Sequence, residues 1–264
     1  MSTDKRAALL GNDIAPVAER TRSRTSAARR IAQRTDLNNY KSIEKLVKKF
    51  TVKKIIHLAA QAGVRYSLKN PGTYFESNLK GFFNILEISR KNNIKHLIFA
   101  STSSVYGDSK KFPVAENENT DHPKSFYAAT KKSNEVMAYS YSNTYKLPCT
   151  GLRFFTVYGP FGRPDMALFK FTKNIINNNH IELFNSGKHF RDFSYIDDII
   201  EGIKLIVNST PNKEIPYEIY NIGNGETRSL LKYLKEIEKN IGKKAKLKKM
   251  SLQIGDIKKT HSNI

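Results

Sequence analysis

Apolar residues in this chain fall into short continuous runs that alternate with longer stretches of helical character. Residues 52–60 (VKKIIHLAA), 95–101 (KHLIFAS) and 149–157 (CTGLRFFTV) are apolar runs of strand length. Between them, residues 75–92 and 127–145 are predicted to be helices, the first from the spacing of its Leu, Phe and Ile positions. This order predicts an α/β fold with a Rossmann-like parallel sheet and helices on both faces.

A helix is also predicted before the first strand. Asp36 would cap its N-terminus, because a carboxylate at this place accepts a hydrogen bond from a free backbone N–H. The helix would end near Phe50, and Lys48 and Lys49 would lie in its last turn, where the helix dipole favours cations.

The pattern becomes looser after Pro160, where shorter elements follow one another. We interpret residues 35–160 as a partial Rossmann-like domain and residues 161–264 as a smaller α/β lobe that binds substrate. The predicted elements of the lobe are a helix over 168–178, a strand over 181–184, a helix over 196–207, a strand over 217–222 and a helix over 230–241.

Composition changes abruptly near residue 35. Seven of the thirteen arginines lie in residues 1–34, which hold only one of the thirty-two lysines. This stretch has no strand periodicity, so we expect an atypical, flexible, Arg-rich segment of foreign or rebuilt origin. A transit peptide is disfavoured by its acidic residues, Asp4, Asp13 and Glu19.

The composition of the whole chain excludes several classes of protein. With 264 residues and 39% hydrophobic residues it can form a proper core, and no apolar run approaches the roughly 18 residues of a membrane span. The single cysteine, Cys149, excludes a disulfide framework and favours the cytoplasm. The six histidines show no pair at helical metal-site spacing, so we expect no metal.

The charge is strongly basic, with 45 Lys and Arg against 24 Asp and Glu and a net charge of +21. Such an excess can indicate a nucleic-acid or membrane surface. The lysines, however, run along the whole chain without interleaved aromatic residues, and we expect most of them on helices, for example at 243–249. They predict a solvated face that favours anionic substrates, with no specific nucleic-acid partner and no membrane partner.

Candidate chemistry gathers where the predicted strands end, the edge at which ligands bind in such sheets. A hydroxyl-rich turn, STSSVYG at 101–107, follows one strand, and Tyr127 and Lys131 lie four residues apart on the next helix. A nearby ammonium favours the phenolate, so the pKa of Tyr127 is expected to fall from about 10 toward neutrality and make it a base. Thr102 could hydrogen-bond the same substrate hydroxyl. Such a Tyr and Lys pair alone is usually a solvated helix face.

From about Thr35 onward the chain resembles the NAD-dependent sugar-nucleotide epimerase/dehydratase family of extended short-chain dehydrogenases/reductases. Within this family it most resembles UDP-glucuronate 4-epimerases. The segments that carry the resemblance are HLAAQAGVRYS (57–67), FESNLKG (75–81), STSSVYG (101–107), YAATK (127–131), RFFTVYGPFGRPDMA (153–167) and RDFSYIDD (191–198). Several motifs in register over some 230 residues are far more specific than any single one.

The resemblance implies an isomerase of polysaccharide biosynthesis that converts UDP-glucuronate to UDP-galacturonate through a 4-keto intermediate. Thr102, Tyr127 and Lys131 would be the catalytic residues, and a tightly held NAD would be reduced and reoxidised within one turnover. Tyr127 would take the proton of the sugar 4-hydroxyl, Lys131 would hold the ribose, and Thr102 would position the hydroxyl.

The resemblance also assigns binding residues. Those of the cofactor would be Asp36 and Leu37 at the adenine, Leu58, Ala59 and Ala60 along the cofactor, Asn78 as support, Phe154 near the nicotinamide, and Tyr127 and Lys131. Those of the substrate would be Thr102, Ser103, Ser104, Thr156, Arg163, Phe184, Arg191 and Asp256. Guanidinium groups suit carboxylate and phosphate oxygens, so Arg163 would face the sugar carboxylate and Arg191 the diphosphate, with surface salt bridges as the alternative.

The sequence also bears on two other reactions of the family, dehydration and decarboxylation. Dehydratases resemble STDEVYG there, whereas this chain has Ser103 and Ser104, which cannot serve as that acid and base. Decarboxylation of UDP-glucuronate remains an alternative, since the 4-keto intermediate is a β-keto acid. The RPDM segment at 163–166 favours retention of the carboxylate, as in the 4-epimerases.

One element of the family pattern is missing. In the family, a glycine-rich loop reaches the pyrophosphate of the cofactor at a helix N-terminus. In this chain, Gly11 is the only glycine before Gly63. An alternative interpretation is therefore an inactive, truncated member that binds a nucleotide, or a partner through an exposed sheet edge. Family members usually pair through helices like 75–92 and 127–145, so a homodimer is expected by similarity.

Overall fold

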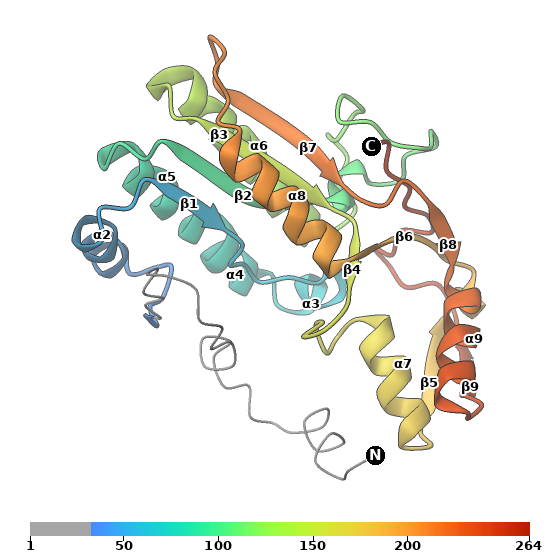
Figure 1. Ribbon diagram of the computed structural model, residues 1–264. Helices are drawn as coiled ribbons and strands as arrows, with labels where there is room; N and C mark the ends of the chain where they lie inside the picture. Colours follow the sequence, from blue (N-terminus) through green and yellow to red (C-terminus); the bar gives the residue numbers. More distant parts are fainter. Residues whose placement is uncertain (1–32) are drawn as a thin grey trace. The chain divides into compact units, whose positions relative to one another are not determined.

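The computed structural model describes residues 33–264 (Figure 1). The chain divides after residue 36, and residues 37–264 form one compact unit. This unit contains all the elements below. The prediction of a flexible segment over 1–34 falls almost wholly outside the described residues.

The main sheet has four parallel strands, in the order β1, β2, β3, β7. These strands are β1 (Lys54–His57), β2 (His96–Thr102), β3 (Cys149–Phe154) and β7 (Tyr217–Ile222). All their carboxyl ends lie at the same edge, and the predicted parallel sheet is confirmed. Among the described strands, β1 lies at one edge of the sheet.

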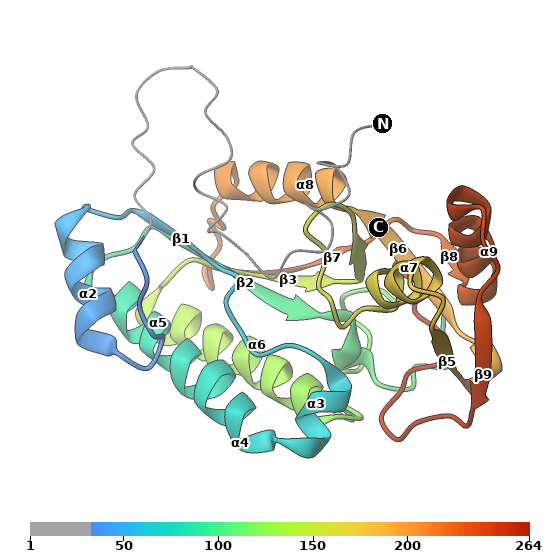
Figure 2. The ribbon, with the colours of Figure 1, turned by 90° about the horizontal axis from the view of Figure 1, so that it is seen from below.

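Helices cover both faces of this sheet (Figure 2). On one face α5 (Gly81–Lys91) and α6 (Phe126–Tyr145) pack on Phe99 of β2, and on the other α8 (Ile196–Asn208) packs on Ile98. Neighbouring residues of one strand thus serve opposite cores, as the two-residue period of a strand requires. The predicted Rossmann-like fold class is confirmed.

The helix before the first strand is α2 (Tyr40–Lys49), and its cap differs from the prediction. The capping side chain is that of Asn39, which accepts a hydrogen bond from the backbone N–H of Ser42 at 3.1 Å. Asp36 is exposed and does not cap the helix, because residues 37–38 form a turn and helical geometry begins only after it.

The helix predicted over 75–92 begins earlier than expected. It is preceded by α3 (Val64–Lys69), and α4 (Pro71–Tyr74) then leads through the π-helical turn η2 (Phe75–Lys80) into α5. Pro71 occupies the first turn of α4, where its missing N–H costs no hydrogen bond. The short helix α3 was not predicted.

Two smaller sheets form beside the main one (Figure 1). The first has the order β4, β6, β8, and the second pairs β5 with β9. The elements of this part are β4 (Thr156–Tyr158), α7 (Ala167–Ile176), β5 (His180–Phe184), β6 (Phe190–Tyr195), β8 (Thr227–Ser229), α9 (Leu230–Ile241) and β9 (Lys246–Met250). The strand predicted over 149–157 is therefore two strands in different sheets.

Two further predictions need correction. The lysines at 243–249 were expected on a helix, but α9 ends at Gly242, which has a left-handed backbone, and pairing with β5 then makes Lys246–Met250 a strand. Residues 161–264 do not form one separate lobe, because β7 is a strand of the main sheet and α8 packs on its face.

Two short helices and the C-terminal residues complete the fold. The 3₁₀ turn η3 (Ser103–Tyr106) follows β2, and η4 (Asn185–Gly187) follows β5. Near the C-terminus, the backbone N–H of Val114 donates to the carbonyl of His261 at 2.9 Å. Within residues 33–264, no helix is long and apolar enough to cross a bilayer.

Candidate active site

The three predicted catalytic residues come together where β2 ends and α6 begins. Thr102 is the last residue of β2, and its side chain accepts a hydrogen bond from the backbone N–H of Ser104. Tyr127 lies in the first turn of α6, and its phenol lies beside the side chain of Thr102. The structure thus places the phenol and the hydroxyl in contact, as a shared role on one substrate oxygen requires.

Lys131 lies one turn further along α6 and is almost completely buried, with an exposed fraction of 2%. Its Nζ donates a hydrogen bond to the carbonyl oxygen of Ala100 at 2.9 Å. Burial lowers the pKa of Lys131 to about 8. An ammonium has three donors, so further acceptors can still be bound here.

The predicted fall in the pKa of Tyr127 is wrong for this structure. Burial raises the pKa of Tyr127 above its usual value, and the hydrogen bond from Thr102 and the charge of Arg163 only partly oppose this rise. The ammonium of Lys131, which was expected to favour the phenolate, donates a hydrogen bond to the carbonyl of Ala100. The helical spacing correctly placed both residues on one face but did not reveal this competing partner.

The loop after β1 carries the predicted cofactor residues Leu58, Ala59 and Ala60, which lie just beyond the carboxyl end of that strand. Asn78 fixes this loop. Its Oδ1 accepts from the backbone N–H of Gln61 at 2.8 Å, and its Nδ2 donates to the carbonyl of Gln61 at 3.0 Å and to Oγ1 of Thr130 at 3.1 Å. Asn78 therefore links the loop to α6, and its supporting role for the cofactor stays a prediction.

Other predicted cofactor residues are not gathered at this point. Leu37 packs against the cluster around α5, and its carbonyl accepts from Nδ2 of Asn84 at 2.9 Å. Phe154, at the end of β3, packs on the α8 side of the sheet. Asp36 belongs to the separate unit 1–36. The binding roles of these three residues stay predictions.

A cleft of about 1170 Å³ lies between the smaller sheets and the loop after β1. Five of the predicted substrate residues line it, namely Thr156, Arg163, Phe184, Arg191 and Asp256. Thr102, Ser103 and Ser104 do not line it. Ser103 borders a separate small cavity with Tyr106 and Phe112.

Arg163 lies at the end of the cleft nearest the catalytic residues. Its charge acts on Tyr127, and it packs over Gly63, where a Cβ would lie 3.4 Å from Nη2. Arg163 is already paired, because Nε and Nη2 donate to the two carboxylate oxygens of Asp165 at 3.0 and 2.5 Å. A sugar carboxylate would therefore share or compete for this guanidinium.

Charged and aromatic groups meet at the other end of the cleft. Nη2 of Arg65 lies 3.2 Å from Oδ2 of Asp256, and the guanidinium of Arg65 stacks 4.3 Å from the ring centre of Phe184. Burial lowers the pKa of Arg191 to about 10, while the charge of Asp256 raises it and that of Arg65 lowers it. Arg65 was not singled out from the sequence.

Two further cleft residues were missed. His189 is 4% exposed, and Nε2 of His189 and Oε1 of Gln253 are buried atoms with no hydrogen-bond partner in the described part of the chain. A buried polar atom without a partner is costly, so such atoms indicate a place where a ligand completes the hydrogen bonds. A lone histidine and a loop glutamine give no sequence signal of this kind.

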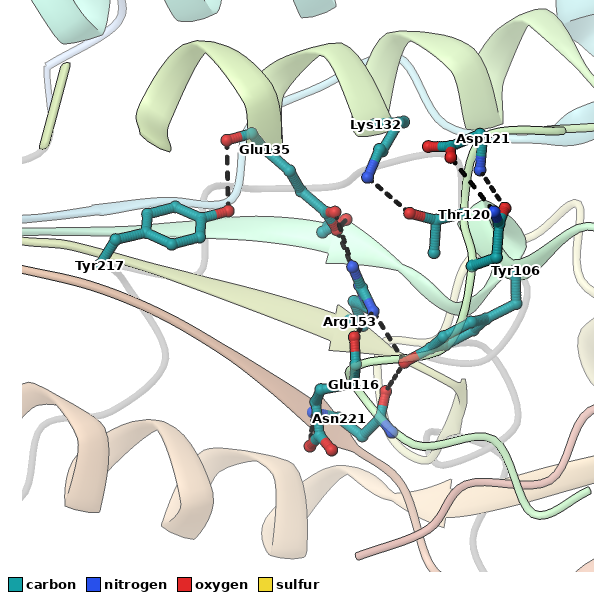
Figure 3. A network of polar contacts seen from close by, with 11 residues as sticks. Tyr106, Glu116, Thr120, Asp121, Lys132, Glu135, Arg153, Tyr217 and Asn221 are labelled. Atoms are coloured by element: carbon teal, nitrogen blue, oxygen red, sulfur yellow. Dashed lines mark hydrogen bonds and ion pairs between the residues drawn. The ribbon is translucent and has the colours of Figure 1, made fainter. Parts of the chain in front are cut away.

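A buried ion pair beneath the catalytic residues was also missed. Nη2 of Arg153, on β3, lies 2.8 Å from Oε2 of Glu135, on α6, and both side chains are about 5% exposed or less (Figure 3). Tyr106, in the turn after β2, joins this network by accepting a hydrogen bond from Arg153. The only signal in the sequence is that Glu135 follows Lys131 by one further helical turn.

Comparisons with known proteins identify the family of this chain. The family model described as the NAD dependent epimerase/dehydratase family matches residues 5–223. Protein CapI of Staphylococcus aureus is 51% identical over 86% of this chain and 72% of its own length. The probable UDP-glucuronate 4-epimerase of Rhizobium meliloti is 45% identical over 79% of this chain and 66% of its own length.

A solved structure agrees with these relatives. UDP-glucuronic acid 4-epimerase from Bacillus cereus, in complex with UDP-glucuronic acid and NAD, superposes with a TM-score of 0.81 and 34% identity, over 87% of this chain and 71% of that one. The chain spans between 56% and 72% of the length of curated relatives such as an Arabidopsis thaliana UDP-glucuronate 4-epimerase and CapI. The resemblance inferred from the motifs is confirmed, and the chain belongs to the NAD dependent epimerase/dehydratase family.

Proposed function

We propose that this chain carries the site of an NAD-dependent UDP-sugar 4-epimerase and that its substrate is UDP-glucuronate, converted to UDP-galacturonate. The observation that carries the proposal is the contact between Tyr127 and Thr102 at the carboxyl end of the parallel sheet, with the buried ammonium of Lys131 one turn away. Phenol, hydroxyl and ammonium at this edge are the groups needed to move a proton at a sugar hydroxyl.

The residues around Lys131 suit a dinucleotide. Its ammonium is buried and hydrogen-bonded to one carbonyl, so it has donors to spare for ribose hydroxyls. The loop over Leu58, Ala59 and Ala60 lies beyond the end of β1, the usual place for a cofactor in such a sheet. NAD, when bound, supplies a reversible hydride acceptor.

The chain's own residues would handle the proton. Tyr127 takes the proton from the sugar 4-oxygen and returns it to the same oxygen after inversion, and Thr102 orients that oxygen by its hydroxyl. Because the pKa of Tyr127 is raised, the phenol form prevails at neutral pH. We therefore expect turnover to increase with pH on the alkaline side of neutrality.

The charges of the cleft support an acidic nucleotide sugar. Arg163 faces the catalytic end, where a sugar carboxylate would reach it, and Arg191, Phe184 and Asp256 lie further along at the nucleotide end. Nε2 of His189, which has no partner within residues 33–264, lies among the nucleotide-end residues, where a nucleotide would complete its hydrogen bonding.

A homodimer of cytoplasmic chains is part of the proposal. Exposed apolar side chains on α5 and α6, among them Phe83, Val136 and Tyr139, suit a helix-to-helix contact with a second copy. Sedimentation of the purified chain tests this. We expect a dimer that Val136→Glu converts to a monomer, and a monomeric parent chain would contradict it.

The test of function is to incubate the chain with UDP-glucuronate and NAD and to identify the products by NMR. We expect UDP-galacturonate. A UDP-pentose with released carbon dioxide would favour the decarboxylase. No product, together with no NAD bound after equilibration, would favour a binding module without catalysis.

A further inference from the structure

The catalytic helix presents three functional groups to the sheet on one face. Tyr127, Lys131 and Glu135 follow one another at intervals of four residues on α6, so their side chains point the same way. Lys131 and Glu135 are both buried. Glu135 is thus the next group below the two catalytic ones, in the layer between α6 and the strands.

The carboxylate of Glu135 joins the helix to two strands. Its Oε1 accepts from Nε of Arg153 at 2.9 Å and from Oγ of Ser101 at 2.6 Å, and its Oε2 accepts from Nη2 of Arg153 at 2.8 Å. Arg153 belongs to β3 and Ser101 to β2, so one side chain fixes α6, β2 and β3 together. Figure 3 shows the pair of Glu135 and Arg153. We call Glu135, Arg153 and Ser101 the clamp.

The clamp continues into the turn after β2. Nη1 of Arg153 donates to the hydroxyl of Tyr106 and to the carbonyl of Glu116, both at 2.9 Å. The hydroxyl of Tyr106 in turn donates to Oδ1 of Asn221, on β7, at 2.6 Å (Figure 3). The hydroxyl-rich turn is therefore anchored by the same arginine that holds the catalytic helix.

The clamp is connected to the catalytic groups through neighbouring residues. Ser101 immediately precedes Thr102, and Ala100, which precedes Ser101, accepts the hydrogen bond of Lys131. Successive residues of β2 therefore contact α6 at Lys131, at Glu135 and at Tyr127. The distance between the phenol and the Thr102 hydroxyl depends on how these contacts align helix and strand.

Stability alone does not explain an ion pair at this place. A buried pair is expensive to desolvate, and apolar residues of similar volume often replace one without loss of stability. What apolar packing lacks is direction, because a two-point contact between guanidinium and carboxylate has one favoured geometry. The clamp thus supplies the angular precision that reacting groups need, where a displacement of about 1 Å can cost up to about a hundredfold in rate.

We propose that Glu135 is a positioning residue that, through Arg153 and Ser101, sets Tyr127 and Lys131 against Thr102. It does not touch the substrate. The inference rests on the proposed function, since it concerns the geometry of that site. It predicts that weakening the clamp lowers kcat and leaves KM for the nucleotide sugar nearly unchanged.

The test compares variants whose changes lie at opposite ends of strands β2 and β3. Glu135→Gln keeps the shape of the side chain but removes its charge, and Ser101→Ala removes one hydrogen bond. The matched control is Thr150→Val, which removes the partner of His96 Nε2, a buried contact of 2.8 Å between β2 and β3 at their amino-terminal ends. All three variants delete buried polar contacts, but only the first two belong to the clamp.

We expect kcat to fall about tenfold for Glu135→Gln and about threefold for Ser101→Ala, with KM changed less than about twofold. The pH profile of kcat should shift in both variants, because Thr102 then supports the phenolate less well. Thr150→Val should keep the kcat and pH profile of the parent chain. Values are compared per folded molecule, with the folded fraction taken from urea unfolding.

Hydrogen exchange supplies a reading that does not depend on turnover. In Glu135→Gln, amides in the first turns of α6 should exchange faster than in the parent chain, and in Thr150→Val they should not. If the parent chain has no turnover, the proposed function fails, but the hydrogen-exchange rates still test the clamp. Clamp variants that match the control in kcat, pH profile and exchange would overturn the proposal.

Discussion

Two arginine–carboxylate pairs of the same chemistry occupy opposite situations in this molecule. Arg153 and Glu135 are 5% and 4% exposed and connect a helix with a strand of the main sheet. Arg163 and Asp165 are 44% and 54% exposed and lie two residues apart in one loop. This loop lies at the end of the cleft nearest the catalytic residues, which we call the mouth of the cleft. Both pairs make two-point contacts. The difference lies in what surrounds them.

That difference separates a fixed contact from an exchangeable one. Between α6 and the main sheet, water cannot replace a lost partner, so Arg153 and Glu135 each depend on the other. At the cleft mouth, water or a substrate carboxylate can take the place of Asp165, and such pairs contribute little to stability. The buried pair therefore suits alignment of the site, and the exposed pair suits ligand exchange.

The largest expected effect comes from breaking the buried pair. Glu135→Leu leaves Arg153 charged and unpaired in the core, so the free energy of unfolding should fall by about 3–5 kcal/mol. Urea unfolding measures this. The double variant Glu135→Leu with Arg153→Met should regain part of this loss. A loss under about 1 kcal/mol in Glu135→Leu would show that the buried pair contributes no more to stability than an exposed pair.

Lys131 extends the comparison to a buried cation that is not in an ion pair within residues 33–264. Its folded pKa of about 8 lies below the usual 10.5, so the unfolded chain binds more protons between these values and stability rises with pH there. Below pH 8 the full cost of burying the charge remains. Relative to Lys131→Met, the parent chain should gain on the order of 2 kcal/mol in unfolding free energy from pH 7 to pH 10.

The control for this experiment is Lys132→Met. Lys132 is the neighbouring residue on α6, and its Nζ donates to Oγ1 of Thr120 at 2.5 Å (Figure 3). Because Lys132→Met keeps Lys131, its unfolding free energy should rise with pH as in the parent chain. Equal pH dependence in the parent chain and in Lys131→Met would show that the buried ammonium does not titrate in this window.

The exposed pair should matter for the substrate more than for the fold. Arg163→Met should lower kcat/KM for UDP-glucuronate about tenfold relative to UDP-glucose, because a charge-assisted contact to the carboxylate is worth roughly 1.5 kcal/mol or more. Steady-state rates with the two nucleotide sugars measure this. An equal decrease for both would remove Arg163 from carboxylate recognition.

The smallest effect is expected for the partner at the mouth of the cleft. Asp165→Asn should change the free energy of unfolding by no more than about 0.5 kcal/mol, the range of an exposed pair. Added salt should reduce even this difference, since exposed charges are screened. Urea unfolding at two salt concentrations tests this, and a loss near that of Glu135→Leu would erase the contrast between the pairs.

The same contrast explains what the sequence could predict. The strand of residues 95–101 and the helix of 75–92 were foreseen because a short apolar run and the spacing of apolar positions are local signals. The four-residue spacing likewise placed Tyr127 and Lys131 on one face. These inferences need only neighbouring residues, and they brought the catalytic groups to the correct edge of the sheet.

Features that depend on distant partners were not foreseen. Glu135 meets an arginine 18 residues away on another element, and nothing in its own neighbourhood indicates burial. The strand β9 forms only because β5 pairs with it, which overrides the helical tendency of a lysine-rich stretch. The pKa of Tyr127 depends on burial and on its neighbours Thr102 and Arg163, and neither can be read from spacing.

The central claim is that the phenol of Tyr127 moves the proton in an epimerisation at C4. It is tested most directly by following UDP-glucuronate with NAD by NMR, for the parent chain and for Tyr127→Phe, with folding confirmed for both. We predict UDP-galacturonate from the parent chain and a rate at least about a hundredfold lower in the variant. Undiminished turnover in Tyr127→Phe would contradict the assignment.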